Sequence, residues 1–250
     1  MIAQIDRFIN TGFRRKVDVD SILELELTFG DFVAHFNEME LFDGPSSYFH
    51  GKTMRLLEEH QCVIADAIED NDYVEALYAT LATWGLHRVG NGANEMIDRD
   101  QFVQLLEQLE PLVRPFEDLH LAELAPDLSE TSRVKADEVA DQLWAIIETI
   151  QIANNNARLV AGTKLLHHLL PNLVPPMDRR YTLNFFYDNN NLNGRTSERS
   201  AFKQLFRSFF VIAYLCQEEI EGIREGGNAF RMNTSFTKVL DNAIVGAFPN

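Results

Sequence analysis

The segment GTKLLHHLLPNLVPPMDRRYT, from Gly162 to Thr182, places an amine, two imidazoles, a carboxylate and two guanidinium groups in one short stretch. The apolar spacing of its first half predicts a helix. On that helix Lys164 shares a face with His167 and His168, because these positions are three and four residues away. Amines act as nucleophiles and imidazoles transfer protons. We therefore expect Lys164 and His168 to be catalytic.

Prolines shape the second half of this segment. Pro171 ends the helix predicted over 158–170, and Pro175 and Pro176 fix an extended turn. That turn brings Asp178 to the start of the next helix, where the helix dipole favours a carboxylate and free amides favour an anion. Asp178 is therefore a third candidate residue of this site. The alternative is that Asp178 only caps the helix while the arginines are solvated and one histidine packs in the core.

Metal and cofactor patterns are missing from the sequence. His167 and His168 are neighbours, so on a helix they point about 100° apart, which is poor geometry for one metal ion. Cys62 and Cys216 form no CxxC pair, and there is no Walker A, GxGxxG, HExxH or GxSxG pattern. We therefore predict no metal and no cofactor. We expect both cysteines to be buried, reduced thiols, and the alternative is a disulfide between them.

Gly162, Lys164, the proline pair and Asp178 together resemble the core of the helix–hairpin–helix DNA glycosylase superfamily, over about 25 residues. That core has a Gly-rich hairpin, a helix that carries a catalytic lysine in the bifunctional members, and a proline–hydrophobic–Asp turn. Here Pro176, Met177 and Asp178 match the turn. The resemblance implies that Asp178 stabilises positive charge on the sugar or orients the nucleophile, and that Lys164 is a candidate amine nucleophile.

This resemblance implies an enzyme that excises a damaged or modified base flipped out of DNA. Two other functions are compatible with the sequence. The chain could be a non-catalytic interaction module whose acidic first part binds a basic protein. It could also be an enzyme acting on a small molecule in a pocket between helical lobes.

Three further stretches combine turn-forming residues with side chains that bind ligands: 42–52, 82–92 and the asparagine run 154–156. An indole stacks on a base, a guanidinium pairs with a phosphate, and amides read base edges. The alternatives are an ordinary turn, a helix C-cap and a plain loop. With Tyr181, the residues expected to bind substrate are Trp84, His87, Arg88, Asn154, Asn155, Tyr48 and His50.

The net charge of −16 is distributed unevenly. Residues 1–155 carry −19 and residues 156–250 carry +3. A local basic face can bind phosphates on an acidic protein, because charges are felt within about a Debye length. The residues expected to hold a DNA backbone are Arg179, Arg180, Arg195, Arg199 and Lys203, in a basic series that continues to Arg207. The alternative is an ordinary solvated surface.

Apolar residues recur at helical spacing along the chain, and no stretch is a convincing strand. We predict an all-α fold of about ten helices, arranged as one continuous domain or as two packed lobes, 1–128 and 129–250. The expected helices span 20–39, 52–70, 72–85, 98–112, 115–126, 129–153, 158–170, 178–187, 197–225 and 234–248, and 42–51 is an expected loop.

No apolar run approaches the ~20 residues that span a bilayer. The N-terminus MIAQIDRFINTGFRRK carries acidic and polar residues within its apolar stretch, unlike a signal peptide. We therefore expect a cytoplasmic protein with no membrane partner.

Overall fold

In the part of the chain that the structure describes, six helices begin at a side chain that accepts a hydrogen bond from a free backbone amide, as N-capping requires. These residues are Asp18, Asp70, Asp98, Ser129, Ser197 and Ser235. At Asp98 the cap is reciprocal, because the Gln101 side chain also accepts from the Asp98 amide. Local sequence therefore marks where these helices start.

The computed structural model describes residues 1–40, 44–86, 96–153, 158–192, 197–226 and 232–249. Its α-helices are α1 (Ile2–Asn10), α2 (Val19–Leu27), α3 (Phe29–Glu38), α4 (Pro45–Glu59), α5 (Ile64–Glu69), α6 (Asn71–Leu81), α7 (Arg99–Val113), α8 (Glu130–Thr149), α9 (Leu159–Leu169), α10 (Thr182–Tyr187), α11 (Glu198–Leu215), α12 (Gln217–Glu225) and α13 (Phe236–Gly246). Short helical turns are η2 (Ala82–Leu86), η3 (Arg114–Phe116) and η4 (Leu121–Glu123). Within these described ranges there is no strand, and the all-α prediction is confirmed.

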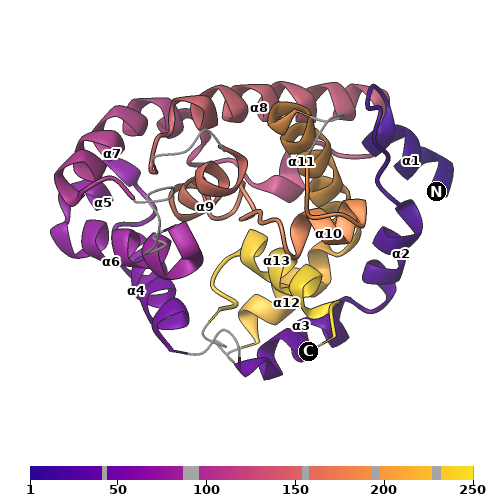
Figure 1. Ribbon diagram of the computed structural model, residues 1–250. Helices are drawn as coiled ribbons and strands as arrows, with labels where there is room; N and C mark the ends of the chain where they lie inside the picture. The colour runs from indigo at the N-terminus through magenta and orange to yellow at the C-terminus, as the bar shows by residue number, and fades with distance from the viewer. Residues whose placement is uncertain (41–43, 87–95, 154–157, 193–196, 227–231, 250) are drawn as a thin grey trace.

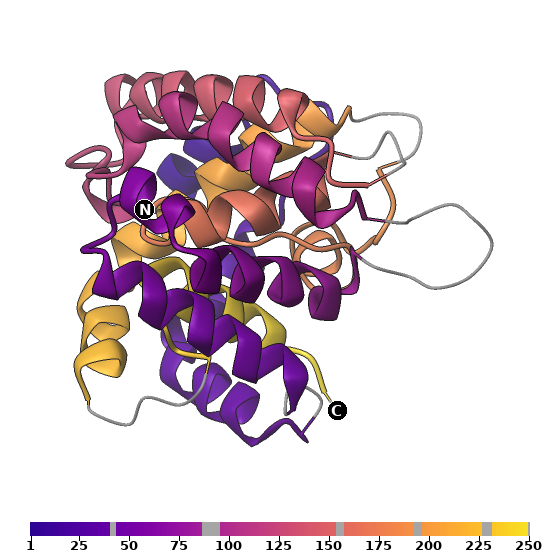
Figure 2. The same ribbon diagram turned by 90° about the vertical axis from the view of Figure 1, so that its left-hand side faces the viewer.

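Helix α9 lies in the interior of the helical assembly, in contact with α6, α8 and α11 (Figure 1). The long helix α8 crosses one edge of the molecule and packs on α11. Helices α4 and α6 pair at one side, and α13 packs on α3. Turned by 90°, the molecule shows α7 and α8 stacked above α4 and α6 (Figure 2). The predicted catalytic helix is therefore surrounded by other elements.

One large cluster of buried apolar side chains runs through the molecule. It includes Phe102 and Leu106 of α7 as well as Phe206 and Phe209 of α11, so it extends to both sides of residue 128. A small second cluster joins Phe36, Met39, Tyr181, Met232 and Val245.

Arg207 ties three elements together inside this structure. Its guanidinium donates to both Asp137 carboxylate oxygens on α8, at 2.5 and 2.6 Å. It also donates to the backbone carbonyls of Phe8, Ile9 and Thr11 at the end of α1. Because Arg207 is only 3% exposed, this last member of the basic series serves the fold.

Three expected helices are each broken by a turn. The breaks divide 20–39 at Thr28, 52–70 between Glu59 and Ile64, and 197–225 at Cys216. In the second break Gln61 and Cys62 adopt left-handed backbone, with φ of 55° and 60°. Non-glycine residues rarely adopt this conformation, so the residue types there do not mark a turn.

The prediction of a loop over 42–51 is wrong from Pro45 onward, because α4 begins there. Proline suits the first turn of a helix, where its missing amide is not needed. Tyr48 and His50 therefore lie on a helix. The expected helix over 115–126 is also wrong, since that span forms the two short turns η3 and η4.

The helix predicted over 158–170 is confirmed as α9. Gly162 lies within α9, where a Cβ atom would meet Ile147 Cγ2 of α8 at 2.7 Å. The glycine thus permits close packing of the two helices. Its position differs from that of a hairpin glycine placed before the lysine helix.

Candidate functional site

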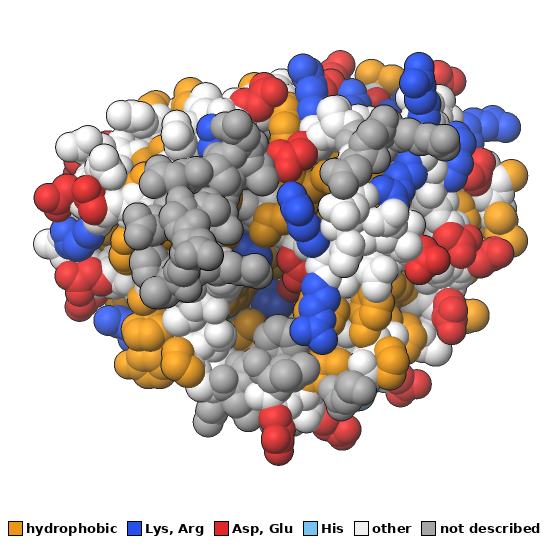
Figure 3. Space-filling model, viewed as in Figure 1, with side chains coloured by type: hydrophobic (Ala, Val, Ile, Leu, Met, Phe, Trp, Pro, Cys, Tyr) orange, Lys and Arg blue, Asp and Glu red, His pale blue; other side chains and the backbone are white. Residues whose placement is uncertain are grey.

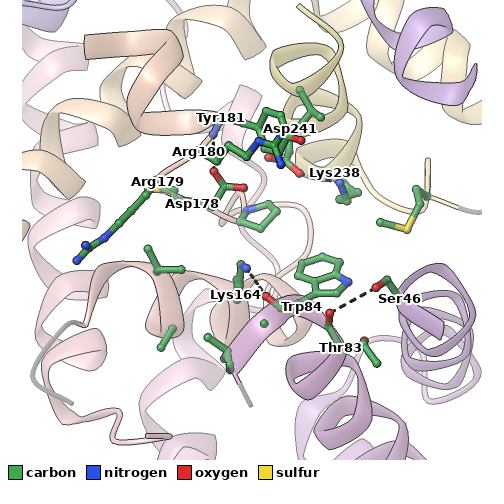
Figure 4. A pocket seen from close by; sticks show the side chains of 18 of the residues that line it. Ser46, Thr83, Trp84, Lys164, Asp178, Arg179, Arg180, Tyr181, Lys238 and Asp241 are labelled. Carbon is green, nitrogen blue, oxygen red and sulfur yellow. Dashed lines mark hydrogen bonds and ion pairs between the residues drawn. The ribbon is translucent and has the colours of Figure 1, made fainter. Parts of the chain in front are cut away.

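A pocket of about 700 Å³ opens beside α9 and α13. Figure 3 shows the hollow near the centre of one face, with basic side chains inside and beside it. The volume is in the range of about 300–1,000 Å³ that is typical of small-ligand sites. Lys164, Asp178, Trp84 and Tyr181, each predicted from the sequence as a site residue, all line it (Figure 4).

Lys164 reaches the pocket because the apolar residues of α9 fix the rotation of the helix. Leu165 and Leu166 are fully buried in the core. The face of α9 that carries Lys164 is therefore directed toward the cavity. Its Nζ donates a 2.7 Å hydrogen bond to the Trp84 carbonyl and lies 5.9 Å from the centre of the indole ring. The ammonium group is therefore held against η2.

Asp178 is placed by a turn that is bonded directly to α9. The Met177 amide donates to Thr163 Oγ1 at 3.1 Å, beside Lys164. Asp178 Oδ1 accepts from the Tyr181 amide at 2.7 Å, and the Asp178 amide donates to the Thr182 hydroxyl at 3.0 Å. The helix expected over 178–187 begins only at Thr182, so Asp178 is not its N-cap residue; it stabilises the turn that leads into α10, and it also lines the pocket. Figure 4 shows Asp178 and Lys164 extending from two different walls.

Lys238 and Asp241 are pocket residues that the sequence analysis missed. Lys238 is 3% exposed, and its Nζ donates to Asp241 Oδ2 at 2.7 Å and to Asn242 Oδ1. Burial raises the pKa of Asp241 above its ordinary value, against the opposing effect of Lys238. The sequence contains a pattern that could have predicted this pair, because Lys238 and Asp241 are three residues apart on a largely apolar helix.

The pocket is locally positive although the chain is acidic. Among the described residues, its lining includes two acidic side chains, Asp178 and Asp241, and four basic ones: Lys164, Arg179, Arg180 and Lys238. Arg179 and Arg180 are exposed, whereas the lysines lie deeper. This charge distribution suits an anionic ligand that reaches the pocket from the surface.

The indole ring of Trp84 lies between the pocket and a group of buried histidines. Its centroid is 5.0 Å from that of His50 and 4.8 Å from that of His168. Lys238 Nζ lies 5.7 Å from the indole centre. The chain turns after Trp84 at Gly85, whose φ of 86° favours glycine.

His50, His167 and His168 form this buried histidine cluster. All three side chains are fully buried, and one ring nitrogen of each lies within 4.8 Å of the other two. His50 Nδ1 is 3.0 Å from His168 Nε2, and His50 Nε2 is 2.7 Å from the Thr234 hydroxyl. Helix α4 therefore brings a third imidazole to the His167–His168 pair.

Burial lowers the pKa of all three histidines, because a buried imidazolium loses its hydration. The pKa of His168 falls to about 4. Those of His50 and His167 lie well below their ordinary value, with His168 as the next largest cause. The cluster is neutral at pH 7. His168 is not among the pocket-lining residues, so it reaches the site only through Trp84 and Lys164.

The remaining predicted residues do not line the pocket or are not described. Tyr48 is 65% exposed on α4 and packs on Phe49. Arg199 and Lys203 of α11 pair with Asp141 of α8, at 3.3 and 2.7 Å. Five further predicted site residues lie outside the described part of the chain: His87, Arg88, Asn154, Asn155 and Arg195.

Both cysteines are free thiols, as expected, although Cys62 is only half-buried. No helix in the described part of the chain combines the length and apolar character needed to cross a bilayer. Comparison of the chain with protein-family models, curated proteins and solved structures found no match.

Proposed function

We propose that this protein binds DNA and hydrolyses the N-glycosidic bond of a damaged or modified base held in the pocket. The observation that carries the proposal is that Lys164 and Asp178, the two residues that resemble a glycosylase core, line one pocket together with Trp84. If these residues lay on separate surfaces, they could not act together on one substrate.

The pocket suits a flipped nucleotide in size and chemistry. About 700 Å³ accommodates a base with its sugar. Trp84 and Tyr181 supply aromatic surface for the base. Arg179 and Arg180 are exposed at the edge, where flanking phosphates of a duplex would lie. An enzyme must extrude the base because its glycosidic bond is inaccessible within the stack.

In the proposed reaction the bond between sugar C1′ and the base nitrogen breaks, and its electron pair leaves with the base. Water adds to C1′ and loses a proton, while the departing base takes one up. The Asp178 carboxylate stabilises positive charge on the sugar or orients the water. The Lys164 ammonium, held by the Trp84 carbonyl, supplies positive charge for the departing base or a phosphate.

The decisive experiment compares Asp178→Asn with wild type on duplexes that each contain one modified base. Asparagine retains an oxygen that can accept from the Tyr181 amide, so the variant is expected to fold and to bind DNA within a few-fold of wild type. Base release is expected to fall by about 10³-fold, as for loss of a group that stabilises transition-state charge. The measurement is free base released in a single turnover.

Asp188→Asn is the matched control, since Asp188 is exposed with a left-handed φ of 49° that asparagine tolerates. It is expected to keep wild-type activity. Borohydride trapping tests whether Lys164 forms an adduct with DNA, and Lys164→Gln must abolish any adduct found. If the wild-type protein releases no base from a broad panel of lesions, the proposal fails and the acidic interaction module takes its place.

A further inference from the structure

The buried histidine cluster has the arrangement of a metal site. His167 and His168 come from α9 and His50 from α4, and their candidate ligand nitrogens lie within 4.8 Å of one another. The sequence-based expectation of no metal considered only the two neighbouring histidines. It could not include His50, which is more than a hundred positions away and was expected to lie in a loop.

Backbone carbonyls fix the tautomers of two of these rings. His168 Nδ1 is 2.7 Å from the Lys164 carbonyl, and His167 Nδ1 is 3.0 Å from the Val174 carbonyl. A carbonyl only accepts, so each Nδ1 carries the proton and each Nε2 presents a lone pair. His167 Nε2 is buried and has no hydrogen-bond partner among the described residues. A buried acceptor without a partner calls for a physical explanation.

The third ring can adopt the matching tautomer. His50 Nε2 is 2.7 Å from Thr234 Oγ1, which can accept a proton from it. In the structure the 3.0 Å contact is a hydrogen bond from His50 Nδ1 to His168 Nε2, so metal binding would require the His50 proton to move to Nε2, where Thr234 Oγ1 accepts it. Each histidine would then present one lone pair inward and donate its other nitrogen to an oxygen. Histidines that bind metals have this outer hydrogen bond almost always.

Three imidazole nitrogens select a borderline transition metal such as Zn²⁺ over Mg²⁺ or Ca²⁺. Zinc–nitrogen bonds of about 2.0–2.1 Å in tetrahedral geometry place ligand nitrogens about 3.4 Å apart. The longest separation here is within 4.8 Å, so side-chain adjustment of about an ångström completes the site. The fourth position would go to a ligand from solvent.

Two lysines, Lys238 and Lys164, are close enough for their charges to lower the pKa of His168. Both ammonium groups have partners of their own, since Lys238 pairs with Asp241 at 2.7 Å and Lys164 donates to the Trp84 carbonyl at 2.7 Å. We propose that His50, His167 and His168 bind one divalent transition-metal ion, with Zn²⁺ as the best fit. This proposal does not depend on the glycosylase reaction.

The test begins with protein stripped by a chelator and titrated with Zn²⁺ against a competing chelator of known affinity. One equivalent is expected to bind tightly, and Co²⁺ is expected to give the intense visible spectrum of a tetrahedral site. His167→Gln is expected to weaken Zn²⁺ binding by at least about 100-fold, because one of three ligands is lost. The matched control is His60→Gln, since His60 pairs with Asp70 on the surface.

X-ray absorption at the zinc edge of the wild-type protein keeps the test independent of whether the variants fold. Three imidazole ligands per zinc are expected. Fewer than three imidazoles, no bound equivalent, or equal weakening in His60→Gln would each overturn the proposal. The cluster would then be a hydrogen-bonded core element that supports α9.

Discussion

At the scale of single residues, Asp178 has two tasks that the sequence presented as alternatives. Its Oδ1 accepts from the Tyr181 amide in the turn before α10, and the same side chain lines the pocket with Lys164. This hydrogen bond holds the carboxylate in one orientation, which a catalytic group requires. The proline turn therefore places this carboxylate both in a backbone hydrogen bond and on the pocket wall.

Cys216 provides a pH-dependent prediction at this scale. Burial raises its pKa to about 12, and only the thiolate reacts with alkylating agents. In the folded protein at pH 8 we expect alkylation about 10³-fold slower than for an ordinary thiol with a pKa near 8.5. Because the thiolate fraction rises with pH up to this pKa, the rate should increase tenfold per pH unit.

The measurement is mass spectrometry of iodoacetamide-treated protein, with and without denaturant. Cys62 is the internal reference, because it is only half-buried and its pKa is raised to a smaller extent. Rapid modification of Cys216 in the folded state would contradict this packing of the end of α11.

At the scale of elements, several helix starts were predicted correctly from the sequence, whereas several helix ends were not. Capping residues are local, so the starts expected at 98, 129 and 197 coincide with the N-caps Asp98, Ser129 and Ser197. The turn at Gln61 and Cys62 has no glycine and is imposed by packing of α4 and α5. Such overrides of local preference come from tertiary contacts.

The close contact between α13 and α3 gives a stability prediction. A Cβ atom at Gly246 would lie 1.9 Å from the Phe32 carbonyl oxygen, and a backbone atom cannot rotate away. Gly246→Ala should therefore lower the free energy of unfolding by about 3 kcal/mol, as overpacking does. Urea denaturation measures this change.

Gly222→Ala on α12 is the matched control, because nothing lies within 4 Å of the added Cβ. Alanine favours a helix over glycine by about 0.5–1 kcal/mol, so this variant should be as stable as wild type or more so. Equal stability of the two variants would show that α3 and α13 are farther apart than described.

At the scale of the whole molecule, packing divides the basic series into two groups. Arg179 and Arg180 line the pocket and are exposed. Arg199 and Lys203 face α8, where Asp141 pairs with both. Positive residues that are close in sequence therefore belong to different surfaces.

This division predicts how DNA binding depends on salt. Replacing both Arg179 and Arg180 by alanine should weaken binding and reduce the slope of log K against log salt by about 1.8, at about 0.9 per phosphate contact. Replacing Arg199 and Lys203 should leave the slope nearly unchanged, since Asp141 already neutralises part of their charge. Fluorescence anisotropy over a salt series distinguishes the two, and identical slopes would place the DNA elsewhere.

The sequence by itself determined the all-α fold, most helix starts and the local turn that delivers Asp178. Those features follow from periodicity, capping and proline geometry, which act over a few residues. Only the tertiary structure decided which polar residues meet. Lys238 of α13 lines the same pocket as Lys164 of α9, and His50 of α4 joins the two histidines of α9. Burial of apolar faces brings these side chains together although they are far apart in the sequence. No local sequence pattern predicts such contacts.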